Sequence, residues 1–481
     1  MDIAWQAQLR FLIPALAATI AAAAAVIHVL LHKRDSRGAF GWIAVCLLFP
    51  LFGPVLYAVF GINRVQIRAQ RLDQRATHAL GQRAPGVDSG HTRRAPAVPE
   101  TLTGLAAAAD QLAAVPLVAG NELAVLHHGD QAYPAMLTAI EQAERYVYLA
   151  TYIFETDIAG RQFVAALGRA VARGVDVRVM LDGFGEYYAW PRRRAGGLLR
   201  RQGVSVARFL APSLLPPSLR INLRNHRKIL VVDGIRGFTG GMNIGDRHVG
   251  AARRPRRVDD MHFALAGPVV HQMETVFLAD WAFVTGERTA AGDPASARGS
   301  ATCRVIDDGP TEDPDRVALL LSAAVATARE RVLIMTPYFL PSAGLIAALQ
   351  AAALRGLDVS IVLPAANNLP YVHWASRHGL RELLVRGVKI YYQPAPFVHS
   401  KLFVVDDGYA LIGSANLDPR SLRLNFEMQV EVYDRGFVAE LADHLAARIE
   451  ASRRYTAADF DQRSLPVRLR DAVAWLFTPY L

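Results

Sequence analysis

The chain has 481 residues, of which 52% are hydrophobic and 20% are charged. This length and composition exclude a disordered tail, and a content of two cysteines excludes a small fold held together by disulfides. The formal net charge of +10 favours an anionic partner, and on charge alone nucleic acid and acidic phospholipid are equally admissible.

Two apolar runs open the chain. The first, residues 11–31, has no Asp, Glu, Lys or Arg, and at about 1.5 Å per residue it covers the roughly 30 Å hydrocarbon layer of a bilayer. The second, residues 40–62, is also uncharged, with Pro50 and Pro54 as expected kinks. We therefore predict a two-helix transmembrane hairpin over residues 1–62. A cleaved signal peptide and a pair of core helices are the alternatives.

The distribution of basic residues predicts how this hairpin is oriented. Three basic residues lie in the loop between the two runs, whereas five arginines lie on the other side. Because positive charge is enriched in cytoplasmic segments, we expect both termini to be cytoplasmic. Residues 63–115 are polar and are predicted to be a linker.

From residue 116 the chain repeats itself. A strand-like run at 146–154 corresponds to another at 332–339, and in each copy a helical segment and a second apolar strand follow. Alternating strands and helices are typical of an α/β fold with a largely buried sheet. We predict two similar α/β halves with mixed sheets, residues 116–300 and 301–481, which meet face to face around one shared active site.

The repeat is closest in an H-x-K-x4-D motif. In both copies Lys follows His at +2, Asp at +7, Gly at +14 and Asn at +17. The candidate site residues are His226, Lys228, Asp233 and Asn243 in the first copy, and His399, Lys401, Asp406 and Asn416 in the second. Only four of the 53 basic residues are lysine, and these motifs contain two of them.

The spacing of the motif has a chemical meaning. On an extended strand residues i and i+2 project on the same face, so each His and Lys point together. An imidazole can attack phosphorus or carry a proton, and an ammonium offsets charge on phosphoryl oxygens. One neutral and one protonated histidine would supply a nucleophile and an acid. Asp233 and Asp406 precede glycine-containing turns, so an orienting or turn role is favoured over a chemical one.

The motif has two alternative interpretations. A single copy would be interpreted as an ordinary strand that has a histidine at its end. The presence of two matching copies disfavours this structural interpretation. A metal site is disfavoured because protonated lysine is a poor ligand and no H-x-H or H-E-x-x-H pattern accompanies the motifs.

These paired motifs resemble those of the phospholipase D superfamily. The second copy, read on to Asn425-Phe426-Glu427, resembles the bacterial cardiolipin synthases, and the resemblance extends to the N-terminal hairpin. It implies a phosphohistidine intermediate, with His226 as nucleophile and His399 as acid and then base. It also implies that Glu427 and Asp260 orient the imidazoles. The first half reads Arg257-Val258-Asp259-Asp260-Met261-His262, which departs from the family's Trp-Arg-Asp-Thr-His.

The resemblance also implies an activity. It is that of a phosphatidyltransferase in the cytoplasmic membrane, joining two phosphatidylglycerol molecules into cardiolipin and glycerol without a cofactor. Its partners would be phosphatidylglycerol, other anionic phospholipids and the membrane, with no nucleic acid. The alternatives are a phospholipase D that hydrolyses lipid, a nuclease, and a non-catalytic lipid-binding scaffold.

The C-terminal tail from residue 465 contains Trp475, Phe477 and Tyr480. It is interpreted either as an amphipathic helix at a membrane interface or as a helix packed on the second half.

Overall fold

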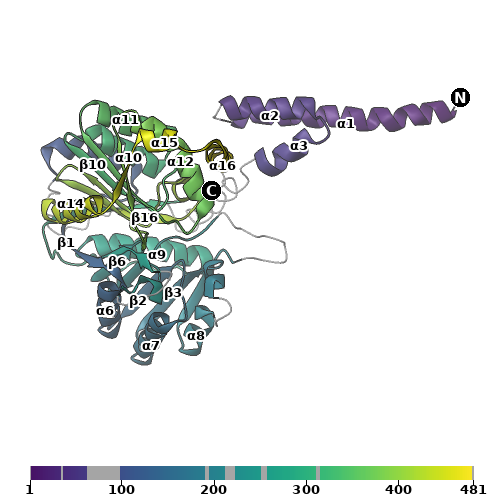
Figure 1. Cartoon of the computed structure of the whole chain (residues 1–481). Coiled ribbons are helices and arrows are strands. Elements are labelled where there is room, and N and C mark those ends of the chain that lie inside the picture. Colours follow the sequence, from purple (N-terminus) through teal and green to yellow (C-terminus); the bar gives the residue numbers. More distant parts are fainter. Residues whose placement is uncertain are drawn as a thin grey trace. The chain divides into compact units, whose positions relative to one another are not determined.

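The computed structural model describes residues 2–33, 36–61, 98–189, 194–211, 223–250, 257–309 and 315–478. The chain divides into two compact units, Met1–Arg68 and Ala69–Leu481 (Figure 1).

The N-terminal unit is helical. Helix α1 (Asp2–His32) contains the stretch Leu12–His32, which among the described residues is the one helical segment long and apolar enough to cross a membrane. Helix α2 (Ser36–Leu48) packs beside it. Val29, Cys46 and Tyr57 are buried together in this unit. The first predicted span is therefore a single helix.

The second predicted span is not one continuous helix. It is divided among α2, the short helix α3 (Gly53–Leu56) and a π-helical turn η1 (Tyr57–Gly61). Pro50 and Pro54 lack the N–H that a continuing helix requires. Gly53 also lies so close to α2 that a Cβ there would be 2.4 Å from the Val45 carbonyl oxygen. The chain therefore turns back at this point.

The second unit is built on one 15-stranded mixed sheet. In the first half the strand order is β1-β8-β6-β5-β2-β3-β4, and β2, β3 and β4 are parallel. The bounds are β1 Val118–His127, β2 Tyr146–Thr151, β3 Asp176–Asp182, β4 Ser205–Phe209, β5 Ile229–Val232, β6 Arg236–Gly240 and β8 Met261–Ala266.

The second half repeats this arrangement. Its order is β17-β12-β11-β10-β14-β15-β16-β9, and β10, β11 and β12 are parallel. The bounds are β9 Ala301–Asp308, β10 Arg331–Met335, β11 Asp358–Pro364, β12 Lys389–Gln393, β14 Leu402–Val405, β15 Tyr409–Gly413, β16 Glu427–Tyr433 and β17 Arg453–Tyr455. Strands β1 and β9 pair antiparallel, so the mixed sheets predicted for the two halves are joined into one.

Helices cover the sheet in both halves. In the first half α6, α7 and α8 lie together, and α9 covers strands from the other side (Figure 1). The bounds are α6 His128–Glu141, α7 Ile158–Ala172, α8 Ala195–Arg201, α9 Val269–Thr285, η3 Gly185–Ala189 and η4 Asp246–His248. Helix α7 begins where the Asp157 side chain accepts a hydrogen bond from the Gly160 N–H, and it is followed by Gly174 at φ +89°.

The second half has corresponding helices and a C-terminal extension. The bounds are η2 Glu100–Leu102, α5 Thr103–Leu112, α10 Arg316–Thr327, α11 Ala343–Leu354, α12 Pro370–Leu384, α13 Pro419–Arg423, α14 Arg435–Glu450, α15 Ala457–Asp461 and α16 Leu465–Leu476. The repeated strand–helix–strand units predicted from the sequence are β2-α7-β3 and β10-α11-β11. Both lie where they were expected.

The predicted linker contains folded structure. Residues 62–97 lie outside the described part of the chain, but Leu102, Leu105 and Ala109, on η2 and α5, are buried in the same core as Val332 and Ile334 of β10. The core of the second half thus includes residues that precede the repeat, because the apolar face of α5 packs against α10.

Candidate active site

The two motifs occupy equivalent places in the sheet. His226 and Lys228 lie in the extended segment just before β5, and His399 and Lys401 lie just before β14. Each of these strands forms a hairpin, β5 with β6 and β14 with β15. The same local sequence thus brings a His–Lys pair to the same end of two equivalent hairpins.

Each motif is bound through its backbone to the opposite half. The His226 N–H donates to the Phe426 carbonyl at 2.9 Å, and the His399 N–H donates to the Asp259 carbonyl at 2.7 Å. The second contact continues the two-stranded parallel sheet formed by β7 (Val258–Asp259) and β13 (Phe397–Val398). The two halves therefore meet at the histidines themselves.

The carboxylates are exchanged between the halves in the same way. Glu427 Oε1, from the second half, lies 3.2 Å from His226 Nδ1, and Asp260 Oδ2, from the first half, lies 2.9 Å from His399 Nδ1. Both carboxylates are fully buried, whereas the imidazoles keep 22% and 18% of their side-chain surface exposed. A carboxylate on Nδ1 orients the ring and directs Nε2 to the reacting group. Each motif histidine is thus paired with a carboxylate from the opposite half.

The two carboxylates have different surroundings. Ser414 Oγ donates to Glu427 Oε2 at 2.6 Å, and Asn425 Nδ2 donates to Oε1 at 3.3 Å. Gly241 takes the place of Ser414 in the first copy, and a Cβ on it would lie 2.5 Å from Asp260 Oδ1. Sequence reasoning did not assign a role to Ser414 or Asn425. The one signal was the difference between Gly241 and Ser414 at the same motif position.

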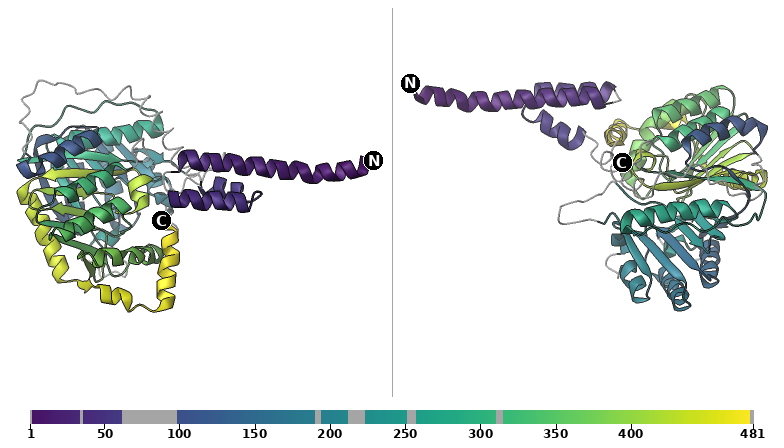
Figure 2. Two further views of the ribbon diagram at one scale, coloured as in Figure 1. Left: turned by 90° about the horizontal axis from the view of Figure 1, so that it is seen from above. Right: turned by 180° about the vertical axis from the view of Figure 1, so that it is seen from behind.

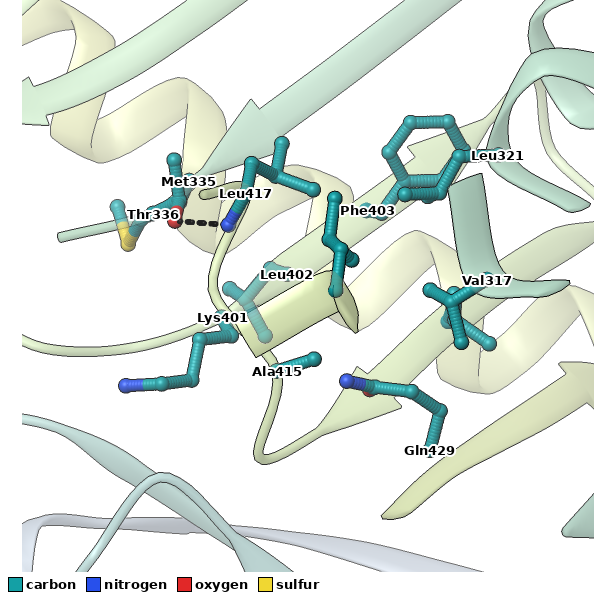
Figure 3. A pocket seen from close by; sticks show the side chains of 12 residues that line it. Val317, Leu321, Met335, Thr336, Lys401, Leu402, Phe403, Ala415, Leu417 and Gln429 are labelled. Atoms are coloured by element: carbon teal, nitrogen blue, oxygen red, sulfur yellow. Dashed lines mark hydrogen bonds between the residues drawn. The ribbon is translucent and has the colours of Figure 1, made fainter. Parts of the chain in front are cut away.

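Both lysines are buried next to their histidines. Lys401 Nζ lies 2.6 Å from the His399 carbonyl oxygen and 3.1 Å from both ring nitrogens of His399. Lys228 Nζ donates to the His226 carbonyl oxygen. Figure 3 shows the Lys401 side chain extending away from the apolar residues around Phe403 and Val317, which enclose a cavity of about 20 Å³. This space holds about one water molecule, so the stem is packed and only the ammonium reaches the site.

Burial determines the protonation states in the site. It lowers the pKa of His226 to about 4, against the opposing effect of Glu427. Burial, followed by the positive charges of Lys401 and Lys228, holds the pKa of His399 well below its ordinary value. Burial also lowers the pKa of Lys401 to about 7. With no anion bound, the site is therefore poor in protons, and an incoming anion would favour protonation of all these groups.

Asp233 and Asp406 form turns at the other end of the hairpins. The Asp233 carboxylate accepts hydrogen bonds from three consecutive N–H groups, those of Glu144, Arg145 and Tyr146. Asp406 accepts equivalent bonds from Arg329, Glu330 and Arg331. Both aspartates have positive φ, 54° and 49°. Seven residues of extended chain span roughly 20 Å, so these carboxylates fasten the strand ends far from the imidazoles.

Asn243 and Asn416 hold the loops that follow the hairpins. The Asn243 side chain accepts from the Ile153 N–H at 3.0 Å, and Asn416 Nδ2 donates to Ser421 Oγ at 3.1 Å. These contacts fix the loops after β6 and β15. Among the described residues no group of three or more His, Cys, Asp or Glu side chains is arranged to hold a metal ion.

The residue between His and Lys also joins the halves. Arg227 is buried and pairs with Asp280 Oδ1 at 2.5 Å, while its guanidinium donates to the backbone carbonyls of Glu427 and Asp308 in the second half. Asp280, on α9, was not identified from the sequence. This buried ion pair holds Glu427 in register with His226.

Two protein-family models match parts of this sequence. Residues 136–281 and 321–449 match the family described as "Cardiolipin synthase, PLD-like domain", and residues 20–61 match the one described as "Phospholipase_D-nuclease N-terminal". The major cardiolipin synthase ClsA of Bacillus subtilis is 30% identical over 95% of this chain and 96% of its own length. Cardiolipin synthase A of Pseudomonas entomophila is 33% identical over 95% of both chains.

A solved structure shares the fold. The phosphatidylserine synthase of Haemophilus influenzae aligns with a TM-score of 0.61 at 14% identity, over 78% of this chain and all of that one. At this identity the likeness concerns the fold alone.

Proposed function

The chain belongs to the cardiolipin synthase family with phospholipase D-like domains, and on that basis we propose that it condenses two phosphatidylglycerol molecules into cardiolipin and glycerol. The observation that carries the proposal is the pair of histidines with exchanged carboxylates, in a chain that matches cardiolipin synthases over 95% of its length. Two imidazoles, each with its Nδ1 held by a carboxylate, and two lysines suit transfer of an anionic phosphodiester.

In the proposed first step, His226 Nε2 attacks the phosphorus of one phosphatidylglycerol. The bond between phosphorus and the headgroup glycerol oxygen breaks, and His399 gives its proton to that oxygen. Glycerol leaves and a phosphatidyl-His226 intermediate remains. His226 is assigned as nucleophile by the family resemblance. Its contact with Glu427 supports the role, since the carboxylate stabilises positive charge on the ring.

In the second step, a headgroup hydroxyl of another phosphatidylglycerol attacks the same phosphorus. His399 takes the hydroxyl proton, the bond to His226 breaks and cardiolipin is released. His399 must be protonated before the first step, although burial holds its pKa well below the ordinary value in the free enzyme. The phosphodiester anion offsets the charges of Lys401 and Lys228, which after burial are the next causes of this low pKa, so substrate binding favours the protonated acid.

The proposal also includes how the chain is placed in the membrane. Residues 1–62 would form a membrane hairpin with α1 as one span and the broken helices of residues 40–62 as the other. Both termini and the two catalytic halves, residues 116–300 and 301–481, would be cytoplasmic, and residues 63–115 would connect hairpin and halves. The apolar helix Leu12–His32 supports membrane association.

A direct assay tests the proposed reaction. Purified protein supplied with phosphatidylglycerol as the only lipid is expected to form cardiolipin and free glycerol in equal amounts, without added metal or nucleotide. Mass spectrometry of the lipid and an enzymatic glycerol assay measure the two products. Phosphatidic acid as the sole lipid product would instead establish a hydrolase, and absence of any product from a folded protein would contradict a catalytic role.

The low pKa of Lys401 predicts how substrate binding depends on pH. Its pKa of about 7 means that Lys401 of the free enzyme loses its charge above neutral pH. Binding of the phosphodiester favours the protonated lysine, so the apparent KM for phosphatidylglycerol should rise as pH increases from 7 to 9, by up to about tenfold per pH unit.

Lys401→Arg provides the control, because a guanidinium stays charged over this range. We expect the arginine variant to have a lower kcat, since the planar group displaces the phosphoryl group, but a nearly flat KM between pH 7 and 9. An unchanged slope in Lys401→Arg would show that another group causes the pH dependence.

A further inference from the structure

The C-terminal helix α16 exposes a stripe of large apolar side chains. Leu465, Leu469, Val473 and Leu476 are 65%, 56%, 55% and 66% exposed, and Phe477, directly after the helix, is 56% exposed. With about 100° of rotation per residue, the four residues within the helix fall inside an arc of roughly 80°. Figure 2 shows this helix as the last yellow element at the edge of the second unit.

The opposite face of α16 fixes the helix to the second half. Ala474 is buried with Leu340, Val372 and Ala375. Asp471 is fully buried and binds Arg377 at 2.9 Å and Arg463 at 2.6 Å. The sequence left open whether this tail packs on the second half or lies at an interface. In the structure one face packs, and the other presents the stripe outward from a fixed helix.

The stripe is flanked by positive charge and by aromatic rings. Arg468 lies on one side and is exposed, and Arg470 lies on the other, where its guanidinium pairs with Asp471 at 2.9 Å and lies 4.5 Å from the centre of the Trp374 ring. Trp475 is 45% exposed beside the ring of His378. An apolar face bordered by arginine and tryptophan fits a bilayer surface that contains anionic headgroups.

The helix also lies close to the site. Tyr338 packs against the cluster that contains Ala474, the Tyr338 and Phe397 rings are 6.3 Å apart, and the Phe397 and His399 rings are 5.9 Å apart. In the first half, the exposed ring of Tyr188 lies 6.1 Å from Tyr152, whose ring is 4.3 Å from His226. Tyr338 and Phe397 therefore lie between the cluster that contains Ala474 of α16 and the imidazole of His399.

We propose that α16 docks on the surface of an anionic membrane, with Leu465, Leu469, Val473 and Leu476 among the acyl chains and Arg468 and Trp475 at the headgroups. This would hold the two histidines at the depth where a phosphodiester lies, so that the lipid reaches them without leaving the bilayer. The inference rests on the proposed function, because that function places the substrate in the membrane.

A fluorescent label reports the docking without measuring activity. The full chain carrying Val473→Cys, labelled with an environment-sensitive nitrobenzoxadiazole dye, is reconstituted in vesicles. We expect blue-shifted, stronger emission in vesicles that contain phosphatidylglycerol than in phosphatidylcholine vesicles. Cys46 and Cys303 are buried, so labelling of the unsubstituted chain gives the background. Leu354→Cys, at a leucine that is 66% exposed on α11, is the matched control and should show no difference.

Activity on two physical forms of the lipid separates docking from catalysis. Leu469→Gln combined with Val473→Gln should raise the apparent KM for phosphatidylglycerol in vesicles about tenfold. Activity on monomeric, short-chain phosphatidylglycerol should be unchanged. Leu354→Gln should alter neither activity.

The outcomes are distinct. Emission that is the same in both kinds of vesicle would overturn the proposal. Emission that rises with protein concentration, together with chemical cross-linking between copies of the chain, would also overturn it and would show that the stripe mediates self-association. Equal losses on vesicles and on monomeric lipid would also overturn it and make the helix structural. Insertion of the label in a chain that forms no cardiolipin would support docking while contradicting the proposed function.

Discussion

Alanine in place of His226 or His399 is expected to lower kcat for cardiolipin formation by about 10⁴-fold or more, and the double variant should be no worse than either single one. The losses should not add, because nucleophile and proton carrier act in the same two steps. Both imidazoles are partly exposed at the site, so their truncation should leave the free energy of unfolding nearly unchanged. Product formation is measured by mass spectrometry and folding by thermal unfolding.

The two histidine variants should differ in one respect. With a donor that carries an activated leaving group, no acid is needed to expel it. His399→Ala should therefore accumulate a phosphatidyl adduct on His226, which peptide mapping after an acid-free quench detects, because a phosphorus–nitrogen bond is acid-labile. His226→Ala should form no adduct. An adduct on His399 in His226→Ala would reverse the assigned roles.

Removal of the exchanged carboxylates is expected to have the next largest effect. Glu427→Gln and Asp260→Asn should each lower kcat by roughly 10²- to 10⁴-fold, since each carboxylate fixes the ring and stabilises the imidazolium. Each amide keeps a similar shape but loses the charge opposite the ring. The pKa of His226, already lowered to about 4 by burial, should fall further in Glu427→Gln.

The exchange between halves can be tested directly. Nuclear magnetic resonance of labelled histidine should show the His226 titration altered by Glu427→Gln and unaffected by Asp260→Asn. The reverse result would contradict the pairing. Asp233→Asn is the matched control, because its carboxylate accepts three backbone N–H bonds at a turn. It should lower the free energy of unfolding by about 1–3 kcal/mol while the folded protein keeps its kcat.

Part of this molecule is determined by local sequence. An uninterrupted apolar run is sufficient to form α1, because a helix satisfies its own backbone hydrogen bonds. The alternation of side chains along an extended segment brings each His and Lys together, and an Asp with Gly one or two residues later is suited to a positive-φ turn. The positive φ at Asp233 and Asp406 fits these local sequences, whereas the N–H groups that bind their carboxylates come from distant residues.

Other features depend on packing contacts between elements, which the hydrophobic pattern does not contain. Residues 40–62 are as apolar as a span, yet the chain turns at Gly53 because that glycine packs against the backbone of α2. Helix α5 lies in a segment that reads as linker, and it is ordered by packing against α10. The apolar residues of α16 are periodic, but the sequence does not indicate that its buried face is the one with Asp471.

The sequence by itself determined that the chain is duplicated, and it predicts which histidines and lysines carry the chemistry. Only the tertiary structure decided which carboxylate serves which histidine. Asp260 and His399 are 139 residues apart, and they meet because β7 pairs with β13 and because β1 and β9 join the two halves in one sheet. Spacing along a chain determines which side chains share a face of a strand. Contacts between distant segments arise from the packing of whole sheets, and a single motif contains no information about that packing.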